Sequence, residues 1–179
     1  MDSCLQQLHE AITAAMSGLT LEELKRRPPG KWCAAEVLEH LYLSYAGTVK
    51  GLGRCLQEGR SLASAGTWSQ RTQTMIVTRL GYMPTGRTAP AQATPRGMAA
   101  EQVVAEICPM IRRMQTLIDE CDARFGRKMI LDHPILGPFT ADEWRKFHWV
   151  HGRHHVKQIW RLRGREVPGT WYSEKRRSF

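Results

Sequence analysis

Apolar residues recur at every third or fourth position along most of the chain, which is the spacing of helices that bury one face. Leu5, Leu8 and Ile12 set this pattern near the N-terminus, and no stretch shows the alternation of period two that is typical of a strand. The pattern predicts long amphipathic helices over residues 3–19, 33–58, 99–126 and 141–164 and a short helix over residues 68–81. Four long helices in a chain of 179 residues predict an all-α fold, with a four-helix bundle as the default architecture.

Proline and glycine mark the breaks between these helices. Residues 82–97 contain three prolines and predict a long irregular loop, the segment we expect to cover a functional site. Pro109 should kink the third long helix or interrupt it. Residues 133–139 predict a further turn-rich connection, and Thr140 with Glu143 predicts a capping box at the start of the last helix.

The composition, 42% hydrophobic and 24% charged, is that of an ordinary globular protein. No apolar run approaches the roughly 18–20 residues that a membrane-spanning helix needs, and the first residues lack the basic and apolar regions of a signal peptide. The five cysteines are odd in number, widely spaced and never arranged as C-x-x-C. This usage predicts reduced thiols and a cytoplasmic protein without membrane contact.

The formal net charge of +9 raises the alternatives of a nucleic-acid surface and of an anionic ligand. The positive charges are spread out, however, and no nucleic-acid motif accompanies them, so we expect a solvated basic exterior and no nucleic-acid partner. The charge is locally dense only in "RLRGR" and in "SEKRRSF". We therefore predict one domain over residues 1–165, followed by a basic C-terminal tail over residues 166–179.

The stretch "FHWVHGRHHVKQ" holds four of the seven histidines. At about 100° per residue, His151 and His155 share one helical stripe with Trp144, His148 lies on it one turn earlier, and His154 lies at its edge. Two imidazoles four residues apart converge on one point, and unpaired polar groups are costly to bury. A metal site explains this stripe better than two core histidines bonded to carbonyls, or an exposed basic helix.

The third ligand predicted by this geometry is His40, in the middle of the second long helix. The same helical face carries Cys33, Ser44 and Gly47, whose small side chains leave room for a pocket that Trp144 also lines. The sequence therefore predicts a cavity beside a cluster of three histidines.

Other residues are candidates for supporting such a site. Glu36 lies one turn before His40 and is a candidate acceptor for an imidazole N–H, and Glu36 or His148 is a candidate for proton transfer. Neither E-x-x-H nor H-E-x-x-H occurs in the chain, which argues against a carboxylate-bridged dinuclear site and against a zincin. A mononuclear site with three histidines remains.

Two segments, "RPPGKWCAAEVLEHL" and "HPILGPFTADEWRKFHWVHGRHHVKQI", resemble the DinB-like (DinB/YfiT) superfamily. The second is especially similar to an uncharacterised branch with a His-Pro-x-x-Gly-x-hydrophobic lead-in, and the resemblance covers about Pro28 to Gln158. It implies an up-down-down-up four-helix bundle, often a homodimer, with a divalent metal on His40, His151 and His155. Gln158, which follows the histidine pair, is a further candidate for supporting the metal. The extra histidines, His148 and His154, leave open which spacing the metal uses.

Characterised members of that superfamily include thiol-dependent transferases and isomerases and some hydrolases. The resemblance thus implies a metal-dependent enzyme, in which a metal-bound low-molecular-weight thiol or water attacks a small electrophilic substrate. Ligand softness favours Zn²⁺ or Ni²⁺. The alternative is a non-catalytic, stress-associated metal-binding bundle, since many members have no known activity.

Overall fold

The computed structural model of the chain describes residues 4–83 and 88–165, so the predicted basic tail over residues 166–179 lies outside the described residues. The fold is mostly helical, as predicted. The helices are α1 (Cys4–Met16), α2 (Leu21–Lys25), α3 (Ala34–Glu58), α4 (Trp68–Thr78), the 3-10 turn η1 (Ala91–Ala93), α5 (Ala100–Phe125) and α6 (Ala141–Leu162). Two short strands, β1 (Leu131–His133) and β2 (Gly137–Phe139), precede α6.

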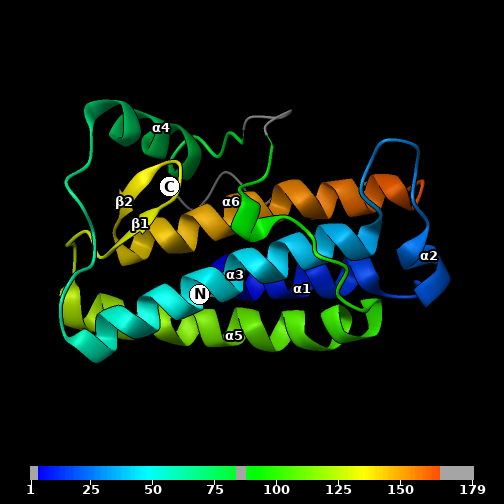
Figure 1. Ribbon diagram of the computed structural model, residues 1–179, viewed down its shortest axis with the longest axis horizontal. Helices are drawn as coiled ribbons and strands as arrows, with labels where there is room; N and C mark the ends of the chain where they lie inside the picture. Colours follow the sequence, from blue (N-terminus) through cyan, green and yellow to red (C-terminus); the bar gives the residue numbers. More distant parts are fainter. Residues whose placement is uncertain (1–3, 84–87, 166–179) are drawn as a thin grey trace.

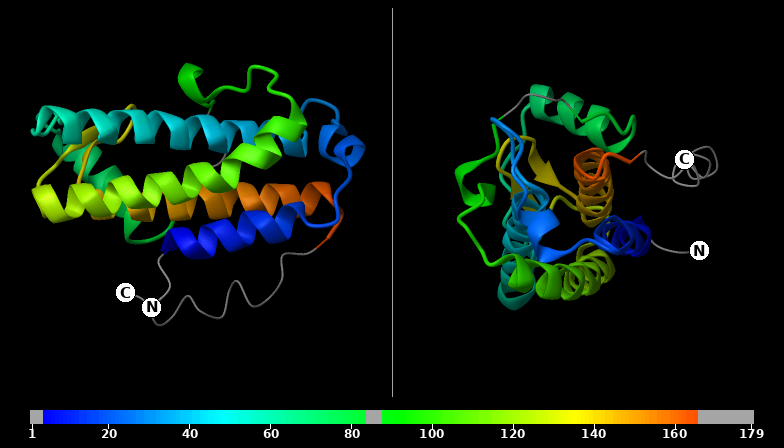
Figure 2. Two further views of the ribbon diagram at one scale, coloured as in Figure 1. Left: turned by 90° about the horizontal axis from the view of Figure 1, so that it is seen from below. Right: turned by 90° about the vertical axis from the view of Figure 1, so that its right-hand side faces the viewer.

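The four long helices lie side by side (Figures 1 and 2), and α1 and α6 run in the opposite direction to α3 and α5. Helix α3 packs against α5 and α6, and α1 packs against α5 and α6. Helix α4 and the strand pair lie together against the first half of α6 (Figure 1). None of the helices in the described part of the chain is both long and apolar enough to span a bilayer.

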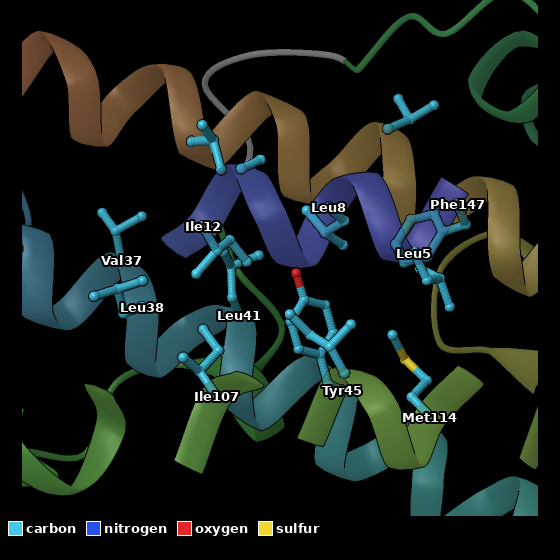
Figure 3. Packing of buried hydrophobic residues seen from close by; sticks show 14 of the residues in the cluster. Leu5, Leu8, Ile12, Val37, Leu38, Leu41, Tyr45, Ile107, Met114 and Phe147 are labelled. Atoms are coloured by element: carbon cyan, nitrogen blue, oxygen red, sulfur yellow. The ribbon is translucent and has the colours of Figure 1, made fainter. Parts of the chain in front are cut away.

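The inner faces of the long helices form one continuous apolar core. Figure 3 shows Leu5, Leu8 and Ile12 of α1 facing Tyr45 of α3 and Met114 of α5, and all five side chains are fully enclosed. These are the positions that the spacing of three and four selects, so burial of this stripe sets how α1 lies on its neighbours.

The predicted capping box at the start of α6 is present. The Thr140 hydroxyl accepts a hydrogen bond from the Glu143 amide at 3.1 Å, and the Glu143 carboxylate accepts one from the Thr140 amide at 2.9 Å. The same carboxylate forms an ion pair with Arg71 of α4 at 2.9 Å. These contacts fix the first turn of α6, and with it the face of α6 that points inward.

The structure decides against one alternative and adds elements that the sequence pattern does not indicate. Helix α5 continues through Pro109, which excludes an interruption there, and buried residues on both sides of it, among them Ile107 and Ile111, hold the helix against the core. Helix α2 was not predicted. The predicted connection over residues 133–139 belongs to a strand pair that begins at Leu131 and places Leu131 opposite Phe139, and three residues per strand are too few to show a period of two.

Helices α1 and α6 approach each other closely at Gly152. A methyl group at this position would collide with Leu8 Cδ1 and lie 3.0 Å from the Tyr45 hydroxyl, and both of these side chains are fully buried. Gly53 of α3 is also helical but has open space where its side chain would project. The two glycines therefore form a matched pair for testing this contact.

We expect Gly152→Ala to lower the free energy of unfolding by about 1–3 kcal/mol, because the added methyl overpacks the α1–α6 contact. Gly53→Ala should raise it by about 0.5–1 kcal/mol, because alanine loses less backbone entropy in a helix. Urea denaturation followed by circular dichroism measures both changes. A Gly152→Ala variant as stable as the Gly53→Ala variant would contradict this packing.

Candidate metal centre

Three histidine side chains from two helices converge on one point. The Nε2 atom of His151 lies 3.0 Å from that of His40 and 3.0 Å from that of His155. The ligand atoms of the three residues all lie within 4.8 Å of one another. His40 comes from the middle of α3, and His151 and His155 are one turn apart on α6. The structure thus brings together the three residues predicted as ligands, and His148 and His154 lie outside the cluster.

Hydrogen bonds determine which nitrogen carries the proton in two of these rings. The Nδ1 atom of His40 lies 2.7 Å from the Ala93 carbonyl oxygen, which can only accept, so Nδ1 is the protonated nitrogen. The Nδ1 atom of His155 donates to the Gln158 side-chain oxygen at 2.8 Å. Both rings therefore present the bare lone pair of Nε2 to His151, and Gln158 contacts the histidine cluster through His155.

This arrangement fits a cation better than it fits hydrogen bonds within the cluster. Because Nε2 of His40 and of His155 both lack a proton, His151 can donate to only one of them, and the lone pair of the other is left without a donor from His151. Nitrogen ligands at 2.0–2.1 Å from a tetrahedral metal lie about 3.3 Å apart, which is close to the two observed separations. The nitrogen donors suit a divalent ion such as Zn²⁺ or Ni²⁺.

Burial keeps these imidazoles neutral. It lowers the pKa of His40, and it lowers the pKa of His155 to about 3. The pKa of His151 is also held well below its usual range, first by burial and then by the neighbouring His155 and His40. All three rings are therefore neutral at pH 7, which is the state in which imidazole binds a metal.

The loop before α5 is tied to α3 by two consecutive residues. The Glu39 carboxylate is buried and accepts from the backbone amides of Arg96 at 2.6 Å and Gly97 at 3.2 Å. The next residue, His40, bonds to the Ala93 carbonyl of the same loop. Described residues of the segment over 82–97 also line the cavity beside the histidines, as predicted for a covering loop.

The cavity has a volume of about 670 Å³ and opens beside the histidine cluster. The predicted residues Ser44, Gly47 and Trp144 line it, together with residues of η1, of α4, of β1 and of the turn between β1 and β2. Among the described residues that line it, Asp132 alone carries a formal charge, and its carboxylate already accepts from the Ser64 amide at 3.0 Å. The described lining of this cavity therefore does not share the net positive charge of the chain.

Two residues predicted to support the histidines or to line the cavity lie away from both. The Glu36 carboxylate accepts from the Cys33 amide at 2.9 Å and pairs with Arg27, so it caps the start of α3 and does not reach an imidazole. Cys33 is buried at the N-cap of α3 and is not among the residues that line the cavity. The ring of Trp32 occupies that side instead, 5.3 Å from the ring of His40. The helical stripe alone could not reveal this, because the chain before α3 folds back over it.

His148 lines the cavity as a packed, neutral ring. Its Nε2 atom lies 2.9 Å from the Thr48 hydroxyl, and its ring stacks on Trp144 and meets the edge of Tyr45. Burial lowers its pKa to about 3. No described group bonds to its Nδ1 atom, which is enclosed. His154 lies nearer the surface, with Nε2 at 3.3 Å from the Gln158 amide nitrogen.

Sequence reasoning missed three contributors to the site. The Ala93 carbonyl and the Glu39 carboxylate act through the folded loop, and the only sequence signal was an acidic residue beside His40 within an apolar stretch. The third contributor is His133, which lines the cavity from β1. Its signal was the "HPILG" motif, which the helical pattern does not explain.

One family model matches nearly the whole described chain. It is described as a protein of unknown function (DUF1569) and matches residues 2–161. No curated protein and no solved structure matches the chain significantly. The family match covers every residue of the histidine cluster and of the cavity.

The buried histidines make a prediction for the metal-free protein. The folded-state pKa values of His148 and His155 are about 3, well below the roughly 6.5 of an unfolded chain, so the unfolded state binds protons first on acidification. The free energy of unfolding should therefore fall below about pH 6.5, by up to about 1.4 kcal/mol per pH unit for each such histidine. Urea denaturation after chelation, between pH 7.5 and 5.5, measures this slope.

A His148→Gln variant provides the control, because glutamine can still bond to Thr48 but does not titrate. Its slope should be shallower than that of the unsubstituted protein. A stability that is constant or rises on acidification would show that these rings are accessible to protons in the folded state.

Proposed function

We propose that this chain, which belongs to the DUF1569 family, is a DinB-like protein that binds one divalent metal ion through His40, His151 and His155. The proposed activity is metal-dependent attack of a thiol or water on a small electrophilic substrate, with thiol transfer as the first candidate. The observation that carries the proposal is the convergence of three Nε2 atoms. Two of them, in His40 and His155, carry no proton, because the Nδ1 atom of the same ring donates a hydrogen bond to an oxygen.

The arrangement of the helices supports the DinB-like part of the proposal. Helices α1 and α6 run against α3 and α5 (Figure 1), which is the order up-down-down-up that the resemblance implies for a four-helix bundle. The three proposed ligands agree with that resemblance in position, one in the second long helix and two in the last. The directions of the helices are independent of the short motifs that first indicated the resemblance, whereas the three histidines lie within those motifs.

The chemistry follows from the neutrality of the ligands. A divalent ion held by three imidazoles keeps its full charge and has an open position at which it favours the anionic form of a thiol or of water. Trp32 and Phe147 place aromatic rings against His40 and His151, which keeps bulk water from that side of the cluster. Gln158 holds His155 in its orientation.

The cavity favours a small substrate of low charge. Its described lining includes no lysine or arginine, so it offers no strong site for a phosphate or for a polyanionic thiol. Hydrolysis is the second candidate function for this reason, since water needs no further binding site. A homodimer belongs to the proposal as well, and the exposed apolar side chains of Trp68 and Met75 on α4 support a contact surface there.

Metal binding is tested by stoichiometry. The purified, untagged protein should hold one divalent ion per chain by mass spectrometry of metals, and His151→Ala should hold less than about a tenth of that. His40→Ala and His155→Ala should lose metal similarly, because two imidazoles do not complete the site. The control is His9→Ala, whose ring bonds to Arg112 on α5 far from the cluster. Full occupancy in the His151→Ala variant would refute the assignment.

The open coordination position is tested with cobalt. We expect Co²⁺-substituted protein to develop a sulfur-to-metal charge-transfer band when a small thiol is added at millimolar concentration, because the thiolate takes the fourth position. No spectral change with any small thiol would contradict the transferase proposal and favour the hydrolytic one.

A Gln158→Leu variant should bind the metal about 10–100-fold more weakly, because His155 loses the acceptor that orients it.

A further inference from the structure

His133 is held in the opposite tautomer to the metal-site histidines. Its Nδ1 atom accepts from the backbone amides of Ile135 at 3.2 Å and Leu136 at 3.1 Å. A backbone amide can only donate, so Nδ1 has no proton and the neutral ring carries its hydrogen on Nε2. His40 and His155 direct a lone pair from Nε2, whereas His133 directs an N–H group.

That N–H group is open to the cavity. His133 lines the same cavity as the histidine cluster. No described residue accepts from its Nε2 atom, and this atom is not among the enclosed polar atoms that lack a partner. The ring of Phe147 separates the two sites, with its centroid 4.5 Å from that of His133 and 5.3 Å from that of His151.

The ring of His133 is also rigidly placed. It stacks on Phe139 at a centroid separation of 5.4 Å and an interplanar angle of 17°, and it makes an edge-on contact with Phe147. Burial lowers its pKa to about 4, so it is neutral at pH 7. A donor that is already oriented loses little conformational entropy when it forms a hydrogen bond with a ligand.

We propose that His133 is a positioning residue whose Nε2–H donates a hydrogen bond to a carbonyl oxygen of the substrate. This inference rests on the proposed function, because the other end of the same molecule would bind at the histidine cluster, across the ring of Phe147. A neutral imidazole donor in a cavity whose described lining has no lysine or arginine suits an uncharged carbonyl better than a phosphate. The substrate class is thus a small thiol or electrophile with an amide or ester group a few bonds from its reactive atom.

Two substitutions separate the two nitrogens of this ring. In His133→Asn the side-chain oxygen can still accept from the backbone amides two and three residues on, but nothing replaces Nε2–H. In His133→Gln the longer amide can supply a donor near the position of Nε2, but the acceptor for the turn is lost. If His133 only stabilised the turn, His133→Gln would weaken ligand binding more than His133→Asn. If His133 positions the substrate, His133→Asn weakens ligand binding more.

The first measurement compares N-acetylcysteamine, a thiol with an amide carbonyl, with 1-butanethiol in cobalt-substituted protein. The unsubstituted protein should prefer N-acetylcysteamine, and His133→Asn should lose about fivefold in affinity for it, the equivalent of one hydrogen bond. Its affinity for 1-butanethiol and its metal content should not change, and His133→Gln should keep most of the preference. Equal affinities of His133→Asn and the unsubstituted protein for N-acetylcysteamine would overturn the proposal.

The second measurement needs no metal. Nitrogen-15 NMR of the metal-free protein should show the His133 hydrogen on Nε2, and this resonance should shift when N-methylacetamide is added at millimolar concentration. A hydrogen on Nδ1, or no shift, would overturn the role of His133 even if the protein binds metal. The expected tautomer and shift in a protein that fails to bind metal would support His133 and refute the metal proposal, so the two failures are distinguishable.

Discussion

The hydrogen bond from His40 Nδ1 to the Ala93 carbonyl is the interaction on which the candidate site depends. It fixes the proton on the nitrogen that faces the loop and so leaves the other nitrogen free to face α6. The same bond holds the loop against α3, and the adjacent Glu39 carboxylate secures the loop a second time through the Arg96 and Gly97 amides. One turn of α3 therefore sets both the orientation of a ligand and the position of a cavity wall.

The cavity has two polar regions of opposite character. At the cluster, Nε2 atoms of His40 and His155 offer lone pairs to a cation, because their Nδ1 atoms donate to oxygen. At the hairpin, His133 offers a hydrogen, because its Nδ1 atom accepts from backbone amides. The same side chain thus serves two roles, and the backbone or side-chain group behind each ring decides which.

The sequence could predict the features that depend on helical periodicity. The positions of the long helices follow from apolar spacing, and the approach of His151 to His155 follows from their separation of four residues. The place of His40 opposite them needed only the expectation of packed helices. Each of these inferences uses one regular geometry, in which sequence distance determines direction in space. The remaining features depend on irregular segments, where sequence distance does not determine direction. The same helical periodicity placed Glu36 on the face of His40. In the structure its carboxylate caps α3 and pairs with Arg27, so it does not contact the imidazole. The carbonyl of Ala93 reaches α3 from a distant part of the chain, and no pattern marks a backbone oxygen. The tautomer of His133 depends on a turn within a hairpin of three-residue strands, which is too short to predict.

The distribution of charge links the exterior of the protein to the selectivity of its cavity. A formal charge of +9 attracts anions to the surface, but this attraction is screened over about a Debye length in physiological salt. Inside the cavity the described lining carries only the carboxylate of Asp132, which a backbone amide already engages. An anion that arrives at the surface would therefore lose its hydration on entry without gaining a cationic side chain from the described lining. The shape of the cavity, the histidine cluster and oriented hydrogen-bond donors then determine which small molecule binds. For this reason the Nε2–H group of His133 can decide between small molecules of similar size.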